Sequence, residues 1–501
     1  MTEDFDQSAR RLPERSPPTG ISVLVVGAGV SGLLAALECW RKGHNVRIIE
    51  KSLMRLRSGD GFSIGPAAIR ALQKWPEMAE ENERISYTIW TSWHQINGEK
   101  VAGPFPVELN NSDDEETTFN GITRPNKVYR HNRLRFHKMM SDQAERIGIF
   151  VEYGKRTVEY YEDAAGQKAG VVLENEERIE ADLIIAADGI GSKSSIITMG
   201  KEVRARSSGS SIYGGTIPIE VVQADPLMSE RFSGVENGIA VVELWQGYVI
   251  PFSGENSSNH HIDIRNITAC GKEHPIICLG LLLYPNQSDE TESWTKTADL
   301  RDVLRKTSQI EGWPEIGDRA IRATPKDRIH DFKLVLRESQ PCWVSPAGRV
   351  AQIGDAAHTF LPSSGNGATQ GLEDAVSLAT CLQVSMKDSI PWATRVHNTL
   401  RFDRVSCLQK IGMINGVARS RPVDEDNPQG TLVGLLGAWL WNHDPEQYAI
   451  DNYDKALAHL QDGTTFQNTN VPRGYVHTPW TIDELLDPKK AEEIWLAGSW
   501  N

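Results

Sequence analysis

The chain has 501 residues, 39% of them hydrophobic and 24% charged, and its formal net charge is -14 at pH 7. A chain of this length and composition can bury one or two large cores, so we expect a globular protein. The acidic balance argues against nucleic acid or an anionic membrane as the partner and favours small molecules.

The six cysteines are scattered and include no CxxC pair, and no histidine cluster has metal-ligand spacing. We therefore expect reduced thiols and no metal. Residues 1–20 are polar and lack the apolar run of a signal peptide, which predicts a mobile tail and a cytoplasmic protein. No segment approaches the roughly 20 apolar residues of a spanning helix. The nearest, residues 431–441, is interpreted as a buried or interface helix, with peripheral membrane contact as the alternative.

A dinucleotide-binding unit is predicted near the start. Residues 21–26 form an apolar strand pattern and residues 33–37 open a helix pattern. The turn between them carries three glycines, Gly27, Gly29 and Gly32. This GxGxxG spacing permits a tight turn, a pyrophosphate close to the backbone N–H groups, and close helix–strand packing. A second strand, residues 46–49, ends in Glu50, which suits a ribose. The alternative is a chance glycine turn in another α/β fold.

Two later strands also end in turns that pair an acid with a glycine. These turns are Asp188-Gly189 and Gly354-Asp355. By itself the first is only a strand terminus. After the second, Gly365 and Gly367 open a helix predicted over residues 370–382. The start of that helix supplies donors for an anion or for an electron-rich reduced flavin.

The three motifs in this order resemble those of the class A FAD-dependent aromatic monooxygenases, and more narrowly the fungal members of secondary metabolism. The resemblance covers residues 23–383. It implies an α/β fold in which a Rossmann-like FAD-binding domain of the p-hydroxybenzoate hydroxylase type is interleaved with an antiparallel-sheet substrate domain. The cofactor-binding residues that it implies are Gly27, Gly29, Gly32, Glu50, Gly61, Arg133, Asp188, Gly189, Asp355 and Ala368. Arg130 is the alternative to Arg133, and either arginine could instead be a solvated helix cap.

The resemblance implies an oxidoreductase that uses FAD, NADPH or NADH, and O2 to hydroxylate or epoxidise an aromatic or indole-like natural product. The protein would position the substrate and exclude water while the flavin carries the redox chemistry. No catalytic residue is assigned, because His358 is interpreted as a packing and hydrogen-bonding residue. The alternatives are a flavin oxidase or dehydrogenase, a halogenase and a non-redox flavin-fold binding protein. The spacing of Trp90 and Trp93 does not fit the halogenase motif.

Three positions depart from the family pattern. Ser195 stands where an arginine is usual, which weakens the prediction of an NADPH pyrophosphate site, although Lys193 offers a nearby charge. Thr369 replaces a common asparagine. Asp60 replaces a small residue and either faces the flavin or caps the helix that follows.

The predicted organisation is a FAD-binding domain split by a substrate domain. Its parts are residues 21–206, with a substrate-side insertion near 85–120, residues 207–324 for the substrate sheet, residues 325–420 for the rest of the FAD domain, and an extension over 421–501. The extension is expected to pack on the FAD domain, cap the pocket or make a homodimer contact. Antiparallel strands are expected over 212–219, 239–244, 248–251 and 276–284. The pocket candidates are Tyr213, Trp245 and Tyr248, with core packing as the alternative.

Overall fold

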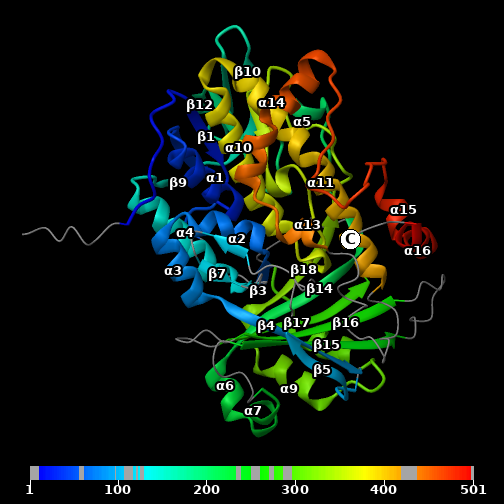
Figure 1. Cartoon of the computed structure of the whole chain (residues 1–501). Coiled ribbons are helices and arrows are strands. Elements are labelled where there is room, and N and C mark those ends of the chain that lie inside the picture. Colours follow the sequence, from blue (N-terminus) through cyan, green and yellow to red (C-terminus); the bar gives the residue numbers. More distant parts are fainter. Residues whose placement is uncertain are drawn as a thin grey trace, which may run out of the picture.

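A five-stranded parallel sheet forms the centre of one half of the molecule (Figure 1). The computed structural model describes residues 11–55, 61–95, 97–106, 117–119, 122–124, 129–232, 239–249, 260–269, 276–285, 296–418 and 437–497. The strand order is β19-β13-β1-β2-β9, with every neighbouring pair parallel. The strands are β1 (Ser22–Val26), β2 (Asn45–Glu50), β9 (Val151–Tyr153), β13 (Leu183–Ala186) and β19 (Val350–Gln352). This arrangement confirms the Rossmann-like α/β prediction.

Alternate residues of β1 are buried on opposite faces of this sheet. Val23 and Val25 belong to the core that contains the apolar residues of α1 (Val30–Arg41) and α10 (Gly367–Ser385). Leu24 and Val26 pack instead against a three-stranded antiparallel sheet. Its strands are β10 (Thr157–Asp163), β11 (Lys168–Leu173) and β12 (Arg178–Ala181). Since both faces are covered, β1 reads in the sequence as one apolar run.

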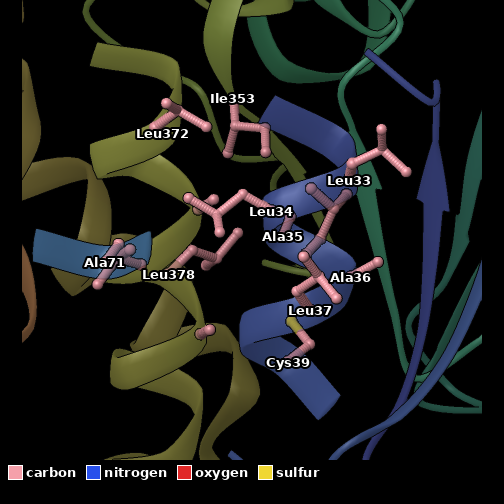
Figure 2. Packing of buried hydrophobic residues seen from close by; sticks show 14 of the residues in the cluster. Leu33, Leu34, Ala35, Ala36, Leu37, Cys39, Ala71, Ile353, Leu372 and Leu378 are labelled. Atoms are coloured by element: carbon pink, nitrogen blue, oxygen red, sulfur yellow. The ribbon is translucent and has the colours of Figure 1, made fainter. Parts of the chain in front are cut away.

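Helix α10 is buried at every position from Thr369 to Leu382. The helices α1, α11 (Ile390–Ala418), α14 (Pro445–Asp462) and α2 (Pro66–Gln73) pack on it. Figure 2 shows Leu34 of α1 and Leu378 of α10 between the two helices. The other helices of this half are α3 (Pro76–Ile85), α4 (Arg133–Arg146), α5 (Ser195–Met199), α13 (Ala438–Trp441), α15 (Ile482–Leu486) and α16 (Pro488–Ala497).

A nine-stranded sheet forms the other half of the molecule (Figure 1). Its order is β18-β14-β17-β16-β15-β4-β8-β3, and β5 pairs with β4. The strands are β3 (Gly61–Ile64), β4 (Tyr87–Gln95), β5 (Lys100–Pro106), β8 (Tyr129–Asn132), β14 (Arg206–Pro218), β15 (Ile239–Val249), β16 (His260–Ala269), β17 (Ile276–Pro285) and β18 (Ile329–Leu336). On the side away from the parallel sheet lie α6 (Ile219–Ala224), α7 (Pro226–Phe232) and α9 (Glu315–Ala323), and α8 (Leu300–Thr307) packs on α9. A separate hairpin joins β6 (Thr117–Phe119) and β7 (Ile122–Arg124).

The large sheet corrects three predictions. It is not wholly antiparallel, because β15 pairs in parallel with β4, a strand from a distant part of the chain that needs no tight turn to reach it. The two strands expected over 239–244 and 248–251 are one strand, β15, and residues 250 and 251 lie outside the described residues. The sheet also continues past the predicted boundary at residue 324, since β18 pairs with β14.

Residues 11–20 are not the mobile tail that their polar composition predicted, and residues 1–10 lie outside the described residues. The amide of Ser16 donates to the Arg41 carbonyl at 2.8 Å, and the Arg15 guanidinium donates to the Trp40 carbonyl at 3.0 Å. Carbonyls at the end of a helix lack partners within the helix, so this segment satisfies the end of α1 and is held there.

The C-terminal extension packs on the α/β half. The buried Arg404 guanidinium donates to the carbonyls of Trp439 (3.1 Å), Leu440 (3.1 Å) and Asn470 (2.8 Å). Of the predicted apolar helix 431–441, the described part is α13, with Leu440 and Trp441 buried. Within the described ranges, no helix is long and apolar enough to cross a membrane.

Buried neutral histidines predict acid sensitivity. Burial lowers the pKa of His44 to about 4, of His131 to about 3 and of His397 to about 4. Below about pH 6.5 these histidines become protonated in the unfolded chain, while in the folded chain they stay neutral. The free energy of unfolding therefore falls as the pH drops from about 6.5 toward 4. Each histidine contributes up to about 1.4 kcal/mol per pH unit in that window.

Urea unfolding of the protein at several pH values measures this slope. We expect His397→Gln to reduce the slope of the free energy of unfolding against pH. The same change at the exposed His459 should leave this slope as in the unchanged protein. An equal slope in all three proteins would contradict the assignment.

Candidate cofactor and active site

Four strands of the parallel sheet deliver the motif residues to one edge. β1 ends before Gly27, β2 ends at Glu50, and the turns with Asp188 and Asp355 follow β13 and β19. The chain passes from β1 to β2 on one side, while β13 lies on the other side, so β1 borders a topological switch point. In open α/β sheets ligands bind outside the carboxyl ends of the strands at such a point.

The glycine turn after β1 has no room for side chains at two of its three positions. Gly27 has a φ of 105°, which favours glycine. A Cβ built on Gly32 would lie 1.9 Å from the Gly27 carbonyl oxygen. A Cβ built on Gly29 would have no neighbouring atom within 4 Å, so the backbone there is open to a ligand. The fold therefore requires glycine at positions 27 and 32, whereas a ligand that approaches the backbone would require it at position 29.

Glu50 is held ionised beside this turn. Its carboxylate accepts from the amides of Ala28 (2.9 Å) and Ser52 (2.8 Å) and from the Ser52 hydroxyl (2.7 Å). Burial by itself raises the pKa of Glu50, but these hydrogen bonds outweigh it and hold the pKa below its ordinary value. An ionised carboxylate with remaining acceptor capacity is suited to ribose hydroxyls.

The two glycine signatures, more than 300 residues apart, meet at Ser31. A Cβ on Gly354 would lie 2.8 Å from the Ser31 hydroxyl oxygen, and one on Gly371 would lie 2.1 Å from it. Neither Gly354 nor Gly371 therefore has room for a side chain. The turn after β19 and the first turns of α10 therefore pack directly on the start of α1, which joins the motifs into one site.

The two helices that follow the glycine motifs, α1 and α10, lack a side-chain cap. The N-cap residues are Gly29 for α1 and Asn366 for α10, and neither side chain accepts a capping hydrogen bond. Asn132 caps α4 and Asp444 caps α14, whereas α2, α3 and α9 also lack a side-chain cap, so it is the position of α1 and α10 beside the glycine turns that matters. Uncapped N–H groups carry the positive end of the helix dipole, so both helix starts can bind negative groups of a cofactor.

Helix α4 brings Arg133 to the same edge. One turn later on the helix, His137 lies 2.8 Å by its Nε2 from the carbonyl of Ala28, which ties α4 to the glycine turn. The positive charge of Arg133 acts to lower the pKa of Asp355. Arg130, the alternative, is engaged elsewhere: it donates to the Gly61 carbonyl at 3.0 Å and to the Ser63 hydroxyl at 3.1 Å. Arg133 as the cofactor-binding arginine stays a prediction, supported by its electrostatic action on Asp355.

The two acids of the later turns have raised pKa values. Burial raises the pKa of Asp188, with the nearby hydroxyls of Ser192 and Tyr160 acting against it. The pKa of Asp355 is also raised, because the surrounding protein partly desolvates it, while His358, Arg133 and Arg337 act against the shift; the residue is nevertheless exposed at the edge of the site. Within the described part of the chain, Oδ1 of Asp188 is buried and has no hydrogen-bond partner. A cofactor hydroxyl would supply the missing donor, so these residues fit FAD.

His358 stabilises the turn after β19, in keeping with its predicted packing role. Its Nε2 lies 2.6 Å from Oδ2 of the buried Asp374, which also accepts from the Gly354 amide at 3.0 Å. Arg401 donates to the other oxygen of Asp374 at 2.8 Å. His358 is therefore part of the support for the turn.

The departures from the family pattern have structural explanations. The Thr369 hydroxyl accepts from the Gly65 amide at 2.9 Å and so joins α10 to the start of α2. The buried Ser195 hydroxyl accepts from the Val203 amide at 3.0 Å. Lys193 forms an ion pair with Glu202, so its charge is already compensated. Asp60 lies outside the described residues.

The structure changes the list of pocket candidates. Tyr213 does not point toward the parallel sheet; it packs in a separate core with Val303 of α8 and Ile321 of α9 on the outer face of the large sheet. Its hydroxyl accepts from Lys306 at 2.8 Å. Trp245 and Tyr248 belong to β15, and their side chains lie outside the described part of the structure.

Four residues that support the site were missed in the sequence. They are His137, Arg337, Asp374 and Arg401. The spacing of His137 four residues after Arg133 places both on one face of a helix and could have indicated its role. The acidic pair Glu373-Asp374 inside an otherwise uncharged helix was a second usable signal.

The fold and the site together define a dinucleotide-binding α/β protein of the flavoprotein class. A profile of the FAD binding domain family matches residues 20–208. The FAD-dependent monooxygenase fsr3 of Gibberella fujikuroi is 37% identical over 98% of this chain and 91% of its own length. The FAD-dependent monooxygenase mdpD of Emericella nidulans is 36% identical over 98% of this chain and 92% of its own.

Solved structures agree with these relatives. The crystal structure of FqzB matches with a TM-score of 0.75 at 27% identity, covering 93% of this chain and 100% of that chain. CtdE in complex with FAD and a substrate matches with a TM-score of 0.73 at 27% identity, covering 88% and 100% of the two chains. The chain belongs to the FAD-dependent monooxygenase family, and FAD is its cofactor.

The glycine turn predicts a contrast between two variants. Gly29→Ala should lower the free energy of unfolding of the apoprotein by no more than about 1 kcal/mol, the cost of alanine at a helix N-cap, because its Cβ meets no protein atom. FAD affinity should nevertheless fall by about tenfold or more, equivalent to about 1.4 kcal/mol. Gly32→Ala should destabilise the apoprotein by about 1–3 kcal/mol, because its Cβ meets backbone.

Urea unfolding of the apoproteins and titration with FAD test this contrast. Two results would contradict the different roles given to Gly29 and Gly32. One is a loss of apoprotein stability in Gly29→Ala as large as that in Gly32→Ala, and the other is an FAD affinity of Gly29→Ala equal to that of the unchanged protein.

Proposed function

We propose that this monooxygenase uses NADPH or NADH with O2 to hydroxylate or epoxidise an aromatic or indole-like natural product in fungal secondary metabolism. The observation that carries the proposal is the convergence of the glycine turn, Glu50, Asp188 and Asp355 at one sheet edge beside two uncapped helix starts. Support comes from the fungal relatives and from CtdE, whose structure holds FAD and a substrate.

The proposed division of labour follows from the site. Gly29 and the start of α1 receive the pyrophosphate, and Glu50 receives the adenosine ribose. Asp188 and Asp355 bind hydroxyl groups toward the flavin end, with Arg133 beside them. The start of α10 faces the flavin, so its N–H groups favour the electron-rich reduced form. When bound, the flavin supplies hydride acceptance and activation of O2.

The substrate is proposed to bind between the parallel sheet and the facing side of the nine-stranded sheet. Tyr213 is excluded from this wall because it packs against α8 and α9 on the outer face. That Trp245 and Tyr248 line the substrate pocket remains a prediction. The work of the protein at this place is to orient the substrate and to exclude water, which would otherwise compete for the activated oxygen.

The site of the nicotinamide donor is proposed to differ from the family pattern. Ser195 is committed to the Val203 amide, and Lys193 is paired with Glu202. Neither offers a free positive charge for a pyrophosphate. A homodimer and a cytoplasmic location also stay predictions.

Flavin reduction tests the proposal. We expect NADPH to bleach the bound flavin slowly under anaerobic conditions, and faster when the panel of phenols and indoles includes the substrate. Isotope-labelled O2 then reports the reaction type, because a monooxygenase transfers one labelled oxygen atom to the product. Substrate oxidation with no label in the product would favour the oxidase or dehydrogenase. Flavin that stays oxidised with both NADPH and NADH across the panel would contradict the proposed donor.

A further inference from the structure

Arg337 lies outside all three motifs but contacts two of them. It follows β18 directly and is 3% exposed. Its Nη1 donates to the Ala356 carbonyl at 3.1 Å, in the turn that carries Asp355. Its Nη2 donates to the carbonyls of Ser192, at 3.3 Å, and of Ile190, both in the loop that carries Asp188. One buried guanidinium therefore spans the two acid-bearing loops.

The surrounding segment fixes Arg337 in this position. Its own amide donates to the Thr359 hydroxyl at 2.8 Å. Three residues later, Gln340 donates to the Ala357 carbonyl at 2.8 Å. The segment after β18 thus holds the turn after β19 at several successive residues. Since β18 is an edge strand of the nine-stranded sheet, the spacing of the loops is tied to that sheet.

The charge of Arg337 matters as well as its shape. Asp188 and Asp355 both act to raise its pKa, while burial acts to lower it. A guanidinium remains charged, and its rigid fork can donate to several carbonyls at once, whereas a lysine ammonium is a compact charge on a flexible stem. Arg337 therefore places one positive charge near both Asp188 and Asp355 and also donates to the two loops that carry them.

We propose that Arg337 is a positioning residue for the flavin half of the cofactor, acting by holding the Asp188 loop against the Asp355 turn. The inference rests on the proposed placement of FAD at this sheet edge. The adenosine half is proposed to be held by the glycine turn and Glu50, whereas the hydrogen bonds of the Arg337 guanidinium go to Ala356, Ile190 and Ser192. Loss of Arg337 should therefore weaken binding of FAD and leave binding of ADP unchanged.

The test compares Arg337→Lys with Arg349→Lys. Arg349 is also buried and donates to a backbone carbonyl, that of Asp182 at 3.0 Å, but at the opposite end of β13 and β19. We expect similar losses of thermal stability in both apoproteins. Only Arg337→Lys should raise the Kd for FAD, by about tenfold or more, with the Kd for ADP within about twofold of the unchanged protein.

The outcomes separate the two proposals. If the unchanged apoprotein does not bind FAD, the proposed site is wrong. If it binds FAD and Arg337→Lys binds it equally well, or loses FAD and ADP alike, Arg337 has only a structural role and the inference is overturned. If Arg337→Lys does not fold, Thr359→Val supplies the readout, because it removes only the acceptor of the Arg337 amide; it should raise the Kd for FAD and not for ADP, and equal values would overturn the inference.

Discussion

The close contact between α1 and α10 is the constraint on which the rest of the site depends. At Gly371 the nearest atoms to a built Cβ include the Gly354 Cα at 3.2 Å as well as the Ser31 hydroxyl, so the turn after β19 and the start of α10 meet the small Ser31 side chain of α1 with no room for a side chain of their own. Such an approach allows the two helix starts to lie side by side at the carboxyl edge of one sheet. Their dipoles then add at one place, and the acids that follow β2, β13 and β19 surround that place.

Buried charges fix the register of this arrangement. Helix α10 supplies the adjacent acids Glu373 and Asp374, and α11 supplies Arg401 and Arg404 three residues apart on one face. Arg401 bonds both acids, at 2.5 Å and 2.8 Å, and Arg404 bonds Glu373 at 2.9 Å. A buried ion pair adds little stability over an apolar pair, but removal of one partner leaves an uncompensated charge at high cost. The network therefore specifies one alignment of the helices. It runs from the C-terminal extension, through Arg404, to the turn that carries Asp355.

The cofactor half of the molecule was predictable because its chemistry uses the backbone. Gly27, Gly32 and Gly354 are glycines for steric reasons, the strand that leads to Asp188 is apolar on both faces, and the strand that leads to Glu50 buries two successive isoleucines just before it, so each leaves a mark in the sequence. Long-range polar contacts leave no such mark. Arg337 is one arginine among many until the fold brings it to two loops. The packing of residues 11–20 was missed for the same reason, since it depends on the unpaired carbonyls at the end of α1.

The large sheet shows why the sequence identifies the cofactor more readily than the substrate. Substrate contacts come from side chains that alternate along strands, and a one-residue offset moves a side chain to the other face. Tyr213 pairs with Leu282, but Gly214 pairs with Gly280, so β17 has one extra residue at this point. A count of alternating positions that starts from one end of β17 therefore disagrees, beyond the extra residue, with a count that starts from the other end. Movement of such an irregularity by one residue would reverse the face only of the residues between its old and new positions, so a pattern of alternation does not fix which residues face a substrate, whereas the glycine contacts of the cofactor turns do not depend on it.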